Sequence, residues 1–165
     1  MTRFEHLVRM AAVCALLFAG SPAVAQGKAK ELASPQTKQV VPKKEHRLVL
    51  QVNSNDPAMM NLALNNATNV DQYYRDLGEK VEIEIVTFGA GLHMLRDDTS
   101  PVKDRIKSIA EKQPSISFKA CGNTQENMSK AENKKIPLVS QATVVKSGVV
   151  RVIELEEQGW SYVRP

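Results

Sequence analysis

Ser115-Ile-Ser-Phe-Lys-Ala-Cys-Gly-Asn-Thr124 is the stretch on which the fold assignment depends. Apolar and polar residues alternate from Ile116 to Ala120, as in a half-buried strand. Cys121 follows directly, and Asn123 or Thr124 is well suited to cap a helix that begins there. The pattern therefore places a thiol between the carboxyl end of a strand and the amino end of a helix. A helix amino terminus favours the thiolate, which is the reactive form of cysteine.

The rest of the chain alternates strands with helices. Arg47 to Val52 is a nearly continuous apolar run, which is typical of a strand covered on both faces. From Pro57 to Leu77, apolar residues recur at steps of three and four, which predicts a long helix. Further strands are predicted over 81–85, 142–146 and 161–164, and further helices over 92–95, 102–110, 125–133 and 149–158. This order predicts one α/β domain of the Rossmann-like or flavodoxin-like kind, with about five mostly parallel strands and helices on both faces.

The predicted strand at 81–85 has one polar face. Glu82 and Glu84 alternate with apolar residues there, which favours a position at the edge of the sheet. An edge position predicts a flavodoxin-like strand order, in which the first and third strands are neighbours. The turn at 53–56 would then face Cys121 across a crevice.

The first 25 residues have the pattern of a secretory signal peptide. Arg3 and Arg9 supply positive charge, and the apolar run at 10–19 is too short to span a bilayer. Ala23-Val24-Ala25 is a small-x-small cleavage signal. Cleavage after Ala25 predicts a periplasmic protein with no membrane association once the signal peptide is removed.

Residues 26–44 are predicted to form a disordered polar linker before an α/β domain at 45–165. The linker carries five Lys against one Glu, whereas the domain carries 15 Lys and Arg against 16 Asp and Glu. The basic excess of the mature chain therefore lies outside the folded part. Nucleic-acid binding is not expected, because it needs basic residues gathered on a folded face.

The mature chain would hold a single cysteine, Cys121, because Cys14 lies inside the signal peptide. An intrachain disulfide is thereby excluded. A lone thiol in an oxidising compartment is buried and inert, paired with another molecule, or reactive. The residue pattern leaves open whether Cys121 belongs to the core or reacts, because free cysteine is among the most buried residue types.

Four strand ends are expected to meet at one rim around Cys121. Their small and polar residues leave backbone N–H groups free for an anion or a thiolate, although turns and caps require the same residue types. His93 is a candidate base for the thiol, or a solvated histidine. The spacing matches no zinc, haem, dinucleotide or phosphate-loop pattern, so neither a metal nor a cofactor is expected. The candidate site comprises Cys121 as the reacting group and, for binding, Asn53, Gly89, Gly91, His93, Gly122, Asn123, Thr124, Ser147 and Gly148.

Several short motifs resemble those of a known family, the DsrE/DsrF-like proteins, and most of all its YchN-related branch. The resemblance covers about residues 47–165. The motifs are Phe118-Lys-Ala-Cys121-Gly-Asn-Thr124, Asn53 with the turn Asp56-Pro57, Gly89-Ala-Gly91-Leu92, Ser147-Gly148-Val149-Val150, and Gln158-Gly159-Trp160-Ser-Tyr162.

The resemblance implies a Rossmann-like domain that assembles into homo-oligomers, as trimers or hexamers. In the best-known members, a cysteine at the end of a central strand carries sulfane sulfur as a persulfide and passes it to a partner, and Cys121 matches that position. Those relays are cytoplasmic, so a secreted relative would meet other partners.

Two functions are therefore expected. The first is a periplasmic sulfur carrier or sulfurtransferase-like protein, acting through a single cysteine in sulfur relay or sulfur oxidation. Its partner would be a donor or acceptor protein or a small sulfur compound. The alternative is a non-catalytic oligomeric module that binds a small ligand or a protein, with Cys121 structural. An exposed sulfur favours the carrier, and a pocket closed over Cys121 favours the module.

Overall fold

The computed structural model describes residues 44–165. The predicted signal peptide and all but the last residue of the predicted linker lie outside the described residues. No helix within 44–165 has both the length and the apolar character that a membrane crossing requires.

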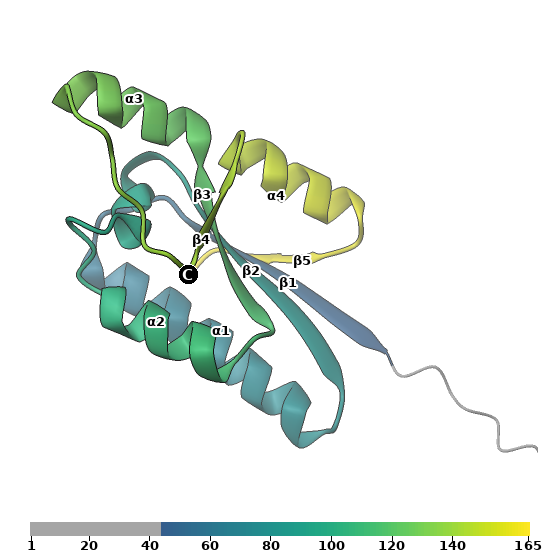
Figure 1. Cartoon of the computed structure of the whole chain (residues 1–165). Helices are drawn as coiled ribbons and strands as arrows, with labels where there is room; N and C mark the ends of the chain where they lie inside the picture. Colours follow the sequence, from purple (N-terminus) through teal and green to yellow (C-terminus); the bar gives the residue numbers. More distant parts are fainter. Residues whose placement is uncertain (1–43) are drawn as a thin grey trace, which may run out of the picture. The chain divides into compact units, whose positions relative to one another are not determined.

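Strands and helices alternate along the described chain (Figure 1). The elements are β1 (Glu45–Val52), α1 (Pro57–Asp76), β2 (Lys80–Thr87), the 3-10 helix η1 (Gly89–Leu95), α2 (Lys103–Lys112), β3 (Ile116–Cys121), α3 (Gly122–Glu132), β4 (Ala142–Val145), α4 (Gly148–Glu157) and β5 (Ser161–Val163). The long helix α1 begins at Pro57 as predicted and ends at Asp76, one residue before the predicted limit. Asp56 caps it by accepting the Ala58 N–H at 2.8 Å, and Gly78 follows its end with φ +65°.

The five strands form one sheet in the order β4-β3-β2-β1-β5. Every neighbouring pair is parallel. Ile85 of β2 lies opposite Phe118 of β3, and Cys121, the last residue of β3, lies opposite Val145 of β4. The predicted α/β class with a five-stranded parallel sheet is confirmed.

The prediction that β2 lies at an edge is wrong, because β2 lies at the centre of the sheet. The carboxylate of Glu84 is buried on this strand and faces a cation instead of water. Arg151 of α4 binds it through two nitrogens, Nε to Oε2 at 3.0 Å and Nη2 to Oε1 at 2.7 Å. Because β2 lies between β1 and β3, these two strands are not neighbours, and the predicted flavodoxin-like order is wrong. The turn that begins at Asn53, after β1, therefore does not lie beside Cys121 at the end of β3.

Apolar side chains fill both faces of the sheet. The larger core lies between the sheet and α1, α2 and η1, with Phe118, Leu50 and Ile85 on the strands. On the opposite face, Val49 and Val86 pack against Val152 and Leu155 of α4, with Phe88 and Trp160 at the margin. Figure 1 shows α1 and α2 on one side of the sheet and α4 on the other.

Candidate functional site

Cys121 is both the last residue of β3 and the residue that precedes the first turn of α3. The first residue of α4, Gly148, lies beside it. A Cβ added to Gly148 would be 3.2 Å from the Cβ of Cys121 and 2.8 Å from Cδ1 of Phe88. The amino ends of α3 and α4 therefore meet at one thiol, because β3 and β4 are neighbours in the sheet. Cys121 is only 4 % exposed.

Two opposing effects act on the Cys121 thiol. Burial raises its pKa, because the charged thiolate loses solvation. Hydrogen bonds to the sulfur lower it, first from the Thr124 hydroxyl and then from the backbone N–H groups of Gly148, Thr124 and Asn123. The hydrogen bonds prevail, so the pKa of Cys121 lies below its ordinary value of 9.0. Four donors from two helix amino ends thus stabilise negative charge on the sulfur.

Thr124 joins the sulfur to the start of η1, which follows the neighbouring strand β2. Its Oγ1 accepts the Gly89 N–H at 3.0 Å, which leaves the hydroxyl hydrogen free for Cys121. The prediction that Asn123 or Thr124 caps α3 is wrong, because the helix begins at Gly122 with no residue between strand and helix. The Asn123 N–H donates to the Lys146 carbonyl at 3.1 Å, and this hydrogen bond joins α3 to the turn before α4.

The structure gathers part of the predicted site. Gly122 lies against β4, since a Cβ added there would be 3.2 Å from the Val145 carbonyl oxygen. Ser147 precedes α4, and its carbonyl accepts the Arg151 N–H at 3.0 Å. The predicted residues grouped at the thiol are Cys121, Gly122, Asn123, Thr124, Ser147 and Gly148, with Gly89 joined through Thr124.

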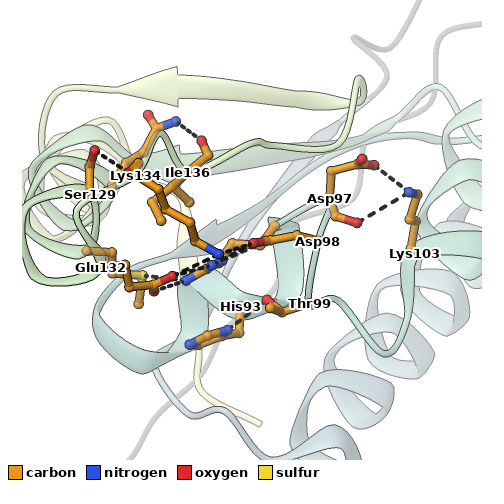
Figure 2. Close-up of polar contacts among 12 residues, drawn as sticks. His93, Asp97, Asp98, Thr99, Lys103, Ser129, Glu132, Lys134 and Ile136 are labelled. Carbon is orange, nitrogen blue, oxygen red and sulfur yellow. Dashed lines mark hydrogen bonds and ion pairs between the residues drawn. The ribbon is translucent and has the colours of Figure 1, made fainter.

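Three predicted site residues lie elsewhere. Gly91 packs against the end of β1, where an added Cβ would lie 2.1 Å from the Val52 carbonyl oxygen and 2.8 Å from the Cα of Asn53. Nδ1 of His93 lies 2.8 Å from Oγ1 of Thr99 (Figure 2), and the donors to the sulfur do not include this histidine. Asn53, Gly91 and His93 therefore have no direct role at the thiol in this arrangement.

Phe88 belongs to the site but was not among the predicted residues. Its ring lies against Gly148, beside the thiol. It follows β2 directly, so the correct strand order would have placed it next to the end of β3. The position of Phe88 directly after β2 was evident from the sequence, but the wrong edge assignment of β2 did not place that strand end beside Cys121.

Within residues 44–165, no group of three or more His, Cys, Asp or Glu side chains could hold a metal ion. Cys121 is a free cysteine. The chemistry that the arrangement supports is that of one thiol, whose ionisation is favoured by hydrogen bonds from the backbone and one hydroxyl.

Comparison with known proteins supports the fold. The chain is similar to a solved structure from Methanobacterium thermoautotrophicum, described as the protein of unknown function MTH1491. The match covers 73 % of this chain and 99 % of that one, with 29 % identity and a TM-score of 0.61. No family model matches the chain. No curated protein sequence matches it either.

Proposed function

We propose that this protein is a sulfur carrier in which the Cys121 thiolate accepts sulfane sulfur as a persulfide and passes it to a partner. The observation that carries the proposal is the position of Cys121 where the amino ends of α3 and α4 meet, with hydrogen-bond donors from both helices lowering the pKa of its thiol. A neutral thiol is a weak acceptor and gains little from four donors. A thiolate carries a full charge, and donors of this kind lower its free energy.

The transfer step needs only the thiolate and a persulfide donor, R–S–SH. The Cys121 sulfur attacks the outer sulfur of the donor, and a new S–S bond forms. The S–S bond of the donor breaks, and its electron pair leaves with R–S⁻. The proton stays on the transferred sulfur, and the two sides balance without an added oxidant or reductant. A partner thiolate removes the sulfur by the same step. Neither transfer needs a general base, so the step does not require His93, whose Nδ1 contacts Thr99.

A second candidate function rests on the burial of Cys121. Only 4 % of this residue is exposed to solvent. This favours the non-catalytic module, in which Cys121 packs the junction of two helices and the domain binds a small ligand or a protein. The two candidates differ in whether a reagent reaches the sulfur of the folded protein.

The proposal includes export to the periplasm and self-association, as the signal sequence and the family resemblance imply. Four apolar side chains near the thiol and along α4 are about half exposed and suit a subunit contact: Val144, Val149, Val150 and Ile153. Light scattering of residues 26–165 tests this part. A trimer or hexamer is expected, and a monomer at all concentrations contradicts it.

The main experiment asks whether Cys121 of the folded protein takes up sulfur. The mature chain is treated with glutathione persulfide, and its intact mass is measured. A gain of one sulfur atom is expected in the wild type and none in Cys121→Ser. Alkylation is measured in parallel, with and without denaturant. A thiol that alkylates only after unfolding, and gains no sulfur, overturns the carrier and supports the module.

A further inference from the structure

Helix α3 supplies three of the four donors to the Cys121 sulfur, but apolar packing holds it only weakly. No residue of α3, all of which is described, is fully buried. Met128 packs at the margin of the larger core and is the apolar contact of this helix with it. Polar contacts must therefore fix much of the helix's position.

The strongest of these contacts comes from Arg96, which is 1 % exposed and follows η1 directly. Its Nε and Nη2 donate to the two carboxylate oxygens of Asp98 at 2.9 and 2.8 Å. Nη1 and Nη2 both donate to Glu132, the last residue of α3, the latter at 2.9 Å. A planar guanidinium suits two such paired contacts at once.

Lys134 completes the ion-pair cluster around Arg96. Its Nζ lies 3.1 Å from Asp98 Oδ2 and 3.3 Å from Glu132 Oε2. Figure 2 shows Asp98, Glu132 and Lys134 meeting between the end of α3 and the segment before α2. Bonding to Arg96 and Lys134 lowers the pKa of Glu132 to about 2, so the cluster is fully charged at neutral pH.

The two ends of α3 are attached to the two ends of η1. At the start of α3, Thr124 accepts the N–H of Gly89, the first residue of η1. At its end, Glu132 binds Arg96, the residue after η1. The turn between these points is firmly packed, since Gly91, Leu92, Met94 and Leu95 are all buried. A displacement of α3 at Glu132 is therefore expected to shift Thr124 at its other end.

We propose that Arg96 is a positioning residue for Cys121. By holding Glu132 it keeps α3 in the place where Thr124 and the first N–H groups of the helix contact the sulfur. Arg96 does not touch the reacting atoms and acts only through the helix. That the stabilised thiolate serves in sulfur transfer rests on the proposed function, whereas the effect of Arg96 on the thiolate does not.

The test is a titration of the Cys121 thiolate by its ultraviolet absorbance, which reports charge and not access. Glu132→Ala breaks the contact at a partly exposed residue, and Glu132→Gln keeps an acceptor oxygen. Glu126→Ala removes the same charge from an exposed position on the same helix and is the control. We expect the ionisation constant of the Cys121 thiol to fall about threefold to tenfold in Glu132→Ala, because hydrogen bonds to a charged acceptor are weakened. A smaller decrease is expected in Glu132→Gln and none in Glu126→Ala.

Circular dichroism at each pH shows that the variants are folded, and Arg96→Lys is added where it folds. A Glu132→Ala titration that matches the wild type overturns the positioning role. The persulfide assay is read separately. A shifted titration without sulfur uptake overturns the carrier but not the positioning role. If the wild type takes up sulfur but Glu132→Ala titrates like the wild type, the carrier proposal stands and the positioning role is overturned.

Discussion

Thr124 makes the site depend on one side chain. The other donors to the Cys121 sulfur are backbone N–H groups, which follow from the course of the chain. The Thr124 hydroxyl alone can be removed without changing the backbone, and it also accepts the Gly89 N–H at 3.0 Å. Valine has nearly the same shape and lacks the hydroxyl, so Thr124→Val isolates the contribution of this group.

We expect Thr124→Val to lower the ionisation constant of the Cys121 thiol by about tenfold, because a hydrogen bond to a charged group contributes roughly 1.5 kcal/mol or more. Thiolate absorbance against pH measures this change. Thr124→Ser keeps the hydroxyl and should titrate close to the wild type. A valine variant that titrates like the wild type would show that the backbone donors suffice.

At the scale of residues, the sequence located the thiol and most of the residues around it, but not the long-range contacts that join them. Apolar and polar residues alternate before Cys121, and Gly122 follows it. These local signals were enough to predict a strand followed by a helix. The role of Thr124 depends on Gly89, 35 residues away, and no local pattern indicates that bond. The role of Arg96 was missed for the same reason, since its partner Glu132 is 36 residues away.

At the scale of elements, the site depends on how closely α4 approaches β3. Gly148 allows this approach, since an added Cβ would be 2.8 Å from Cδ1 and 3.0 Å from Cβ of Phe88. Gly148→Ala should therefore lower the free energy of unfolding by about 1–3 kcal/mol, as overpacking usually does. Urea denaturation measures the loss. The double variant with Phe88→Leu should recover part of it, and a neutral Gly148→Ala would show that the helix moves away freely.

The strand order could not be predicted from the elements alone. Alternating Glu residues on β2 indicated a wet face, but Glu84 is covered by Arg151, 67 residues further along the chain. A buried carboxylate paired with a distant cation has the same local pattern as an exposed one. Element type was therefore predictable from periodicity, and element limits to within a few residues, whereas the neighbours of each strand depended on contacts that the pattern does not encode.

At the scale of the whole molecule, a thiolate that the fold stabilises must in turn stabilise the fold. The pKa of Cys121 lies below 9.0 in the folded protein, while the unfolded chain has the ordinary value. Between these two pKa values, the unfolded state binds more protons than the folded state, so stability rises with pH. The contribution is fully present above pH 9.0 and is lost as the pH falls through the folded pKa.

The free energy of unfolding of the wild type, relative to that of Cys121→Ser, is therefore expected to rise as the pH increases from neutrality to about 9.0 and then to level off. Urea denaturation under reducing conditions at a series of pH values measures the difference. Serine does not titrate in this range, so other groups cancel between the two proteins. If burial governed the thiol, its folded pKa would exceed 9.0 and the difference would instead decrease above that pH. The sign of this slope separates a thiolate site from a packed cysteine without reference to any sulfur donor.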